Sequence, residues 1–251
     1  MSTALGVPAP DMLAALKNYD ETRIHDQIAR DSFRCMPHDV LSEFGISIPT
    51  ALKAFIGASY FHGTRAAQPE AFADQGILPL GDALDGIWSY LRVLAGADIT
   101  DSEWVSFRES LACGAGEDDG FLFRHKTADL SMWGPHGMLV KETLLSPIEA
   151  GIHDYLNGPE IIEDITHAIE VEYQIPLLDR FVATTRPCIV EFRSSSLGVD
   201  EIQSAIWYLY SRTRKQQLSN VIQGGFAGNG KPVPSHHVVA VEVVDNRRLG
   251  S

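Results

Sequence analysis

The chain has 251 residues, of which 45% are hydrophobic and 21% charged, and its formal net charge is −13 at pH 7. Such a chain can bury a sizeable core by itself, and its negative charge disfavours general binding to nucleic acid. No apolar run approaches the roughly 18 residues of a membrane span and no secretory signal opens the sequence, so we expect a cytoplasmic protein.

The beginning of the chain predicts a helical extension. Apolar residues such as Ile24 recur at helical spacing over 11–34, and Asp11 is a candidate helix cap. Two short helical turns are expected next, over 37–45 and 47–55.

The following part predicts one strand and then helices. The apolar run 56–61 is the first expected strand, and it delivers His62 at its C-terminal end. A short helix stopped by Gly76 comes next, and two helices with acidic first turns are expected over 82–95 and 101–112.

Two further strands are expected around a turn in the middle of the chain. They span 120–126 and 136–145, and Gly134-Pro135 between them should force the turn. The segment 114–120 before them predicts a loop.

The last part of the chain alternates helices and strands. Isoleucines at helical steps predict a helix over 159–173, and the apolar segment 186–192 predicts a strand. Residues 198–217 predict a helix with Asp200 as its cap, and β-branched residues over 238–244 predict a buried strand.

No repeat, low-complexity tract or linker divides the sequence. We therefore expect residues 1–50 to form the helical extension and residues 51–251 to form one α+β domain. The basic stretch 211–217 predicts a solvated helix end rather than a nucleic-acid patch, because the average field of the chain repels nucleic acid.

The segment 60–65, YFHGTR, places an imidazole, a glycine and a hydroxyl side by side. Glycine lets the backbone approach a ligand closely, and the side chains of His62 and Thr64 can both hydrogen-bond a polar ligand. By residue type alone, His62 could equally bond a neighbouring carbonyl group.

Followed by a short helix and the turn GILPL, the residues His62, Gly63 and Thr64 resemble the first motif of the ADP-ribosyltransferase superfamily. The later segments are similar in order to its bacterial-toxin and RNA 2′-phosphotransferase-like branches. The resemblance implies a split, mixed β-sheet core with flanking helices. It also implies NAD as the substrate, with Gly63 pairing with the nicotinamide carboxamide, His62 binding a ribose hydroxyl and Thr64 a neighbouring hydroxyl or loop.

One position departs from the family pattern. The family places a glutamate at the start of the penultimate strand, where its carboxylate supports the positive charge that develops on the ribose. This chain has Gln223 there, and an amide supplies no countercharge. Either Gln223 is the true equivalent, or Glu191, Glu242 or Glu142 has the catalytic role.

Other residues are candidates for contacts with the rest of NAD. Arg65 and Arg124 carry planar guanidinium groups that suit the pyrophosphate, or equally a surface ion pair. Trp133 could stack on a nicotinamide or adenine ring or could fill the core, and His136 stands nearest to the second motif of the family.

A metal-dependent hydrolase is the main alternative from another class. Its ligands would come from His125, Asp129, His136 and the pair His236 and His237. No short-spaced ligand pair on a helix supports this alternative, and adjacent histidines on a strand would point to opposite faces. The three cysteines are far apart and predict neither disulfides nor a zinc site.

A protein of the same fold that binds a nucleotide or a partner without turnover is the second alternative, and the missing glutamate favours it. The resemblance leaves the acceptor of ADP-ribose open. The acidity of the chain favours a protein or a small molecule over naked nucleic acid. A toxin, a modifier of host machinery and a phage-defence component are all compatible with these features.

Overall fold

The computed structural model describes residues 1, 5–20, 32–114 and 117–245. Ile24, which we assigned to the N-terminal helical pattern, lies outside these residues. No helix in the described part of the chain is long and apolar enough to cross a membrane.

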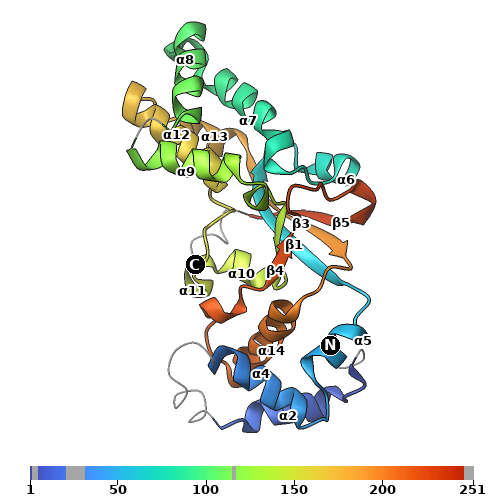
Figure 1. Ribbon diagram of the computed structural model, residues 1–251. Coiled ribbons are helices and arrows are strands. Elements are labelled where there is room, and N and C mark those ends of the chain that lie inside the picture. The colour runs from blue at the N-terminus through green and yellow to red at the C-terminus, as the bar shows by residue number, and fades with distance from the viewer. Residues whose placement is uncertain (2–4, 21–31, 115–116, 246–251) are drawn as a thin grey trace. The chain divides into compact units, whose positions relative to one another are not determined.

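Five strands form one sheet in the order β4-β2-β1-β3-β5 (Figure 1). β1 runs antiparallel to β2 with Phe61 opposite Met138, and β3 runs antiparallel to β5 with Val190 opposite Val241. The α+β class is therefore confirmed, while the split ADP-ribosyltransferase-like core stays a prediction. The strands are β1 (Ala58–Ala66), β2 (His136–Met138), β3 (Arg186–Ser194), β4 (Gly225–Ala227) and β5 (Val238–Val243).

The chain forms two compact units, each built from three segments. The first unit contains Met1–Phe61, Gly137–Ile152 and Arg193–Phe226, and the second contains His62–His136, His153–Phe192 and Ala227–Ser251. The boundary expected at residue 50 stays a prediction.

In the first unit, α14 (Val199–Arg214) packs against three N-terminal helices (Figure 1). Its residues Ile206 and Trp207 belong to a core that also includes Leu16 and Val40. The helices of this unit are α2 (Ala9–Asn18), α4 (Ser32–Ser42), α5 (Ile48–Ala54), α10 (Lys141–Leu145), α11 (Pro147–Ala150) and α14, with the short turn η4 (Asn220–Ile222).

Both helix caps expected in this unit were placed a few residues too late in the sequence. Pro8 precedes α2, and Asp11 lies in the first turn of that helix. Gly198 precedes α14, where its N–H donates to Glu201 Oε2 at 2.8 Å, and Asp200 lies in the first turn. In both cases the acidic residue faces the positive end of the helix dipole without capping it.

In the second unit, four aromatic side chains form the centre of the core. Trp88 contacts Trp104, Phe107 and Phe123 edge-on, with ring centroids 5.5, 6.1 and 5.9 Å apart. The long helices of this unit, which lie near one another in Figure 1, all contribute residues to this core. They are α7 (Leu80–Ala95), α8 (Asp101–Ala112), α9 (Glu117–Ala128), α12 (Glu160–Tyr173) and α13 (Leu177–Thr184).

The strand expected over 120–126 is wrong, because these residues belong to α9. In a strand, Phe121 and Phe123 would share one face. Here Phe123 is buried against Trp88 while Phe121 is 60% exposed, as the helical period requires. Because α9 begins at Glu117, residues 117–120 are helical, and the loop expected over 114–120 is wrong for them.

Two other strands differ from expectation. The strand expected over 136–145 is only β2, and α10 follows it. The strand at 238–244 forms as β5 but is not buried, since Val239 and Val243 are 46% and 43% exposed and only Val244 is buried. Because β5 stands at the end of the strand order, it pairs with β3 alone.

Candidate functional site

His62 lies in the middle of β1 rather than at its C-terminal end, because the strand continues to Ala66. Its ring is partly buried, and Nδ1 lies 2.8 Å from the carbonyl oxygen of His136 on β2. A carbonyl oxygen only accepts hydrogen bonds, so Nδ1 carries the proton. Burial lowers the pKa of His62, which keeps the ring neutral and leaves Nε2 with an acceptor lone pair.

His136 is thus brought to His62, but through its main chain. Its own ring is exposed, with Nε2 3.4 Å from the carbonyl oxygen of Met132. The structure therefore supports a role for His136 in orienting the ring of His62.

Gly63 and Thr64 follow His62 in the same extended segment. Alternation along β1 places Tyr60, His62 and Thr64 on one face of the strand and the α-carbon of Gly63 on the other. Gly63 has no side chain, so Thr64 alone adds a polar side-chain group, its hydroxyl, on the face of His62.

The turn behind the motif requires a glycine. Two helical turns, η1 (Pro69–Ala71) and α6 (Phe72–Gln75), end at Gly76, which has φ 77°. A Cβ at this position would lie 2.1 Å from the carbonyl oxygen of Val233. The next residue, Ile77, pairs with Val233 in an antiparallel bridge, so the helix stop expected at Gly76 is confirmed.

Arg65 is a buried structural residue, 6% exposed. Nε donates to Thr185 Oγ1 at 3.1 Å, Nη1 donates to the carbonyl oxygen of Leu156 at 2.8 Å, and Nη2 donates to the carbonyl oxygens of Val182 and Thr185 at 2.9 and 3.0 Å. This guanidinium group is engaged within the protein, which corrects the expectation that it contacts a pyrophosphate.

Trp133 also has a packing role. Its Nε1 donates to the carbonyl oxygen of Thr127 at 3.0 Å, and its ring occupies the place where a Cβ at Gly81 would stand, 1.9 Å from that position. Of the two roles considered for Trp133, the structure favours filling space in the protein over stacking on a ligand.

Gln223 and two of the glutamates considered for the catalytic role have different surroundings. Gln223 lies two residues before β4, the penultimate strand, and its Nε2 donates to the carbonyl oxygens of Ala150 and Gly151, both at 3.2 Å. Glu142 lies on α10 rather than on a strand and pairs with Arg212. Glu191 lies on β3, partly buried, in the same unit as His62.

The basic stretch near the end of α14 is held within the protein. Arg212 pairs with Glu142, and Arg214 donates to the carbonyl oxygen of Tyr19 and lies 5.0 Å above the ring of Tyr210. Arg212 and Lys215 are exposed, as expected for a solvated helix end.

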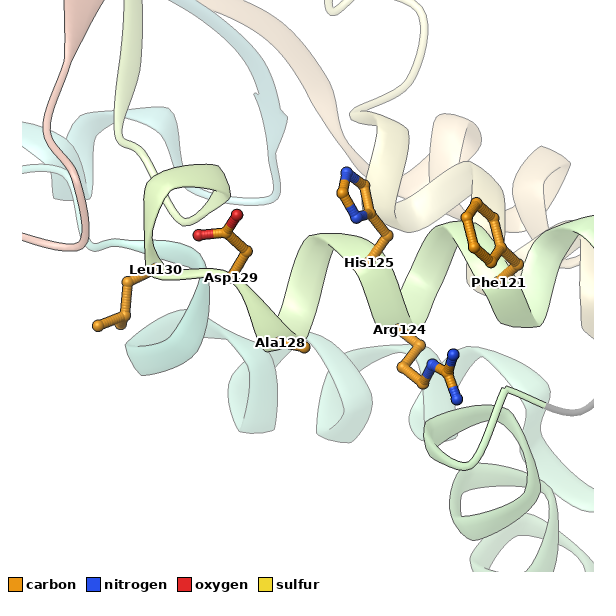
Figure 2. Close-up of a pocket in the computed structure, with 6 residues that line it drawn as sticks. All are labelled: Phe121, Arg124, His125, Ala128, Asp129 and Leu130. Carbon is orange, nitrogen blue, oxygen red and sulfur yellow. The ribbon is translucent and has the colours of Figure 1, made fainter.

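Arg124 lines a shallow hollow of about 510 Å³ on the outer surface of α9 (Figure 2). The hollow was not predicted, because Phe121, Arg124 and His125 were assigned to a strand and its other three residues to the turn after it. It lies in the second unit, to which His62 also belongs. Its lining residues are Phe121, Arg124, His125, Ala128, Asp129 and Leu130.

A charge network that was not predicted from the sequence joins α9 to α12. Lys126 Nζ lies 2.8 Å from Asp164 Oδ2 and 3.2 Å from Glu160 Oε2, and Tyr155 donates to the other oxygen of Glu160 at 3.1 Å. Glu163 lies one turn along α12, 3.7 Å from His153 Nε2. The carboxylates at helical spacing in α12 were the available signal for this network.

The metal site considered above finds no support in the described residues, among which no group of three His, Cys, Asp or Glu side chains could hold an ion. His236 and His237 lie in a helical turn, η5 (Ser235–His237), not in a strand, with ring centroids 4.5 Å apart.

Comparison with known proteins gives no relative. No protein-family model, no curated protein and no solved structure matches this chain. The function can therefore be inferred only from the residues themselves.

Proposed function

We propose that the chain is an NAD-binding, ADP-ribosyltransferase-like protein that transfers ADP-ribose from NAD to a protein or small-molecule acceptor. In this proposal His62 Nε2 accepts a hydrogen bond from a ribose hydroxyl, and the main chain of Gly63 pairs with the nicotinamide carboxamide. Thr64 adds a hydroxyl beside them.

The observation that carries the proposal is the bond between His62 Nδ1 and the carbonyl oxygen of His136. It fixes the ring and its tautomer, so the remaining nitrogen is an acceptor. The lowered pKa of His62, caused chiefly by burial, keeps that acceptor available at neutral pH. A sugar hydroxyl is a suitable donor for it.

The reaction would form a bond between an acceptor nucleophile and the ribose carbon that carries nicotinamide. The glycosidic electron pair would pass to the pyridinium nitrogen, nicotinamide would leave neutral, and the proton of the acceptor would go to solvent. Positive charge on the ribose needs an anion nearby. We assign this part to Glu191, because Glu142 is paired with Arg212, Gln223 is neutral and Glu242 lies on the edge strand β5.

The test is an NAD titration by calorimetry together with an assay of nicotinamide release. His62→Asn keeps an N–H donor near the position of Nδ1 and removes the acceptor at Nε2. We expect NAD affinity to fall about tenfold with little change in thermal stability, because one hydrogen bond to the ligand is lost. His38→Asn on α4, where the side chain is 64% exposed, is the matched control.

Equal NAD affinity in wild type and His62→Asn would overturn the proposal. Glu191→Gln separates turnover from binding: we expect it to reduce nicotinamide release and to leave NAD affinity unchanged. Binding of NAD by the wild type without any release would instead support the alternative of a binding protein, which the bonding of Gln223 to main-chain carbonyls favours.

A further inference from the structure

The outer face of α9 carries two rows of side chains with a hollow between them. Phe121, His125 and Asp129 project on one side of the helix, and Arg124 and Ala128 lie on the other (Figure 2). Leu130 lies at one end, two residues after the last residue of the helix. The volume of about 510 Å³ is within the range of about 300–1,000 Å³ that is usual for small-molecule sites.

The hollow combines apolar and aromatic surface that water now covers. Phe121 and Leu130 are 60% and 61% exposed, whereas Ala128 between them is small. The rings of Phe121 and His125 are parallel within 2°, with centroids 6.1 Å apart. A flat ring that lies over Ala128 would cover the surface beside Leu130, and a group that extends from it along the helix would reach Phe121, about 10 Å away.

The charges of the hollow are separated along the helix. Arg124 forms no ion pair with any described residue, and its side chain lies beside Gly114. Asp129 lies more than one turn away and receives the N–H and hydroxyl of Ser131 on Oδ1, at 2.9 and 2.8 Å. These bonds lower the pKa of Asp129, so it stays ionised as an acceptor.

We infer that this hollow binds a planar heterocycle that carries ring N–H donors at one end and an anionic group at the other, as a guanine nucleotide does. Arg124 takes the phosphate, Asp129 accepts from the N–H edge of the base, Leu130 packs against the base, and Phe121 packs against the ribose. A carboxylate accepts two N–H groups from guanine but meets an unprotonated ring nitrogen in adenine, which gives the site its preference.

The test uses the whole 251-residue chain and follows amide and side-chain signals by NMR while GMP, AMP or inorganic phosphate is added. GMP is not a fragment of NAD, whereas AMP is, so only shifts of α9 signals are counted as binding to the hollow and shifts near His62 are not. We expect GMP to shift signals of α9 residues and to bind about tenfold tighter than AMP, with phosphate weaker than both.

Three substitutions test the assigned contacts. Arg124→Gln should weaken GMP, AMP and phosphate alike, and Phe121→Ala should weaken both nucleotides but not phosphate. Asp129→Asn keeps an oxygen acceptor for Ser131 and should abolish the preference for GMP over AMP. Arg193→Gln, at an exposed arginine on β3, is the control for a general loss of charge and should leave binding unchanged.

Equal affinity for GMP and inorganic phosphate would mean that only charge attraction to the phosphate contributes to binding, and it would overturn the inference. Unchanged GMP binding by Arg124→Gln or by Asp129→Asn would also overturn it. The inference does not depend on the proposed NAD site, because His62→Asn should leave the GMP titration as it is in the wild type.

Discussion

His62 and Arg65 lie three residues apart on β1 and have different roles. The imidazole uses one nitrogen for an internal bond and keeps the other as an acceptor, whereas the guanidinium group places all its bonds on four acceptors within the protein. A buried charge is tolerated only when it is well hydrogen-bonded, so Arg65 holds β1 against the segment 182–185 and Leu156. The segment that carries His62 is therefore firmly positioned.

Gln223 illustrates why a single missing carboxylate is hard to interpret from sequence. Its amide nitrogen donates to two carbonyl oxygens at the end of α11. A glutamate there would place an ionised carboxylate against two acceptors. The amide at position 223 thus has a structural reason in this chain.

We predict that Gln223→Glu destabilises the protein at neutral pH by about 1–3 kcal/mol, because two hydrogen bonds are replaced by repulsion between oxygens. Urea denaturation followed by circular dichroism measures the change. Gln75→Glu, at an exposed position on α6, is the matched control and should have little effect. A stable Gln223→Glu variant with higher nicotinamide release would show instead that the position faces NAD.

At the scale of elements, α9 and α12 are joined by a charge network with more acid than base. Lys126 faces Asp164 and Glu160, and Glu163 lies beside them with His153 opposite. Burial, followed by the repulsion of Asp164 and Glu160, raises the pKa of Glu163, although His153 and Lys126 oppose the change. The packed helices therefore hold this carboxyl group in a setting that favours its neutral form.

A raised pKa in the folded state means that the folded protein binds the proton more tightly than the unfolded chain does. The stabilising effect of the proton is complete below the ordinary glutamate pKa of 4.5 and is lost as the pH rises through the raised value. We predict that Glu163→Gln increases the free energy of unfolding at pH 7 and has little effect near pH 4.

Chemical denaturation of both proteins across this pH range measures the difference. Glu149→Gln, at an exposed position on α11, is the control and should not change the pH dependence. A loss of stability in Glu163→Gln at pH 7 would mean that the contact with His153 outweighs burial.

Sequence patterns predicted several elements of this protein well. The helix stop at Gly76, the helix over 101–112 and the strand over 186–192 all form, because a local signal decides each of them. The helix α8 begins with a reciprocal cap in which Thr100 and Glu103 bond to each other's main chain. The segment 120–126 failed because its short apolar run fits a strand or a helix equally well.

At the scale of the whole molecule, each compact unit has its own hydrophobic core. The core of the first unit includes Ile206 of α14, and the core of the second includes Leu91 of α7, both fully buried. No residue belongs to both cores among those described. Local unfolding can therefore differ between the units.

We predict that Ile206→Ala increases hydrogen exchange mainly in peptides of the first unit, and that Leu91→Ala does so mainly in the second. Each substitution should cost about 2–5 kcal/mol, as loss of a buried aliphatic side chain usually does. Hydrogen exchange followed by mass spectrometry measures both variants, and each serves as the control for the other. An equal increase in both units for either variant would mean that the molecule unfolds as one cooperative body.

The sequence by itself determined the α+β class, most helix positions and the motif at His62, because these depend on periodicity, turn residues and the order of residue types along the chain. Only the tertiary structure decided which polar groups are available to a ligand. Arg65 and Gln223 look like ligand contacts in the sequence, yet each bonds to main chain that is far away along it, and the ring of Trp133 fills space against Gly81. A side chain's hydrogen-bonding partners depend on distance in space, which local sequence does not encode.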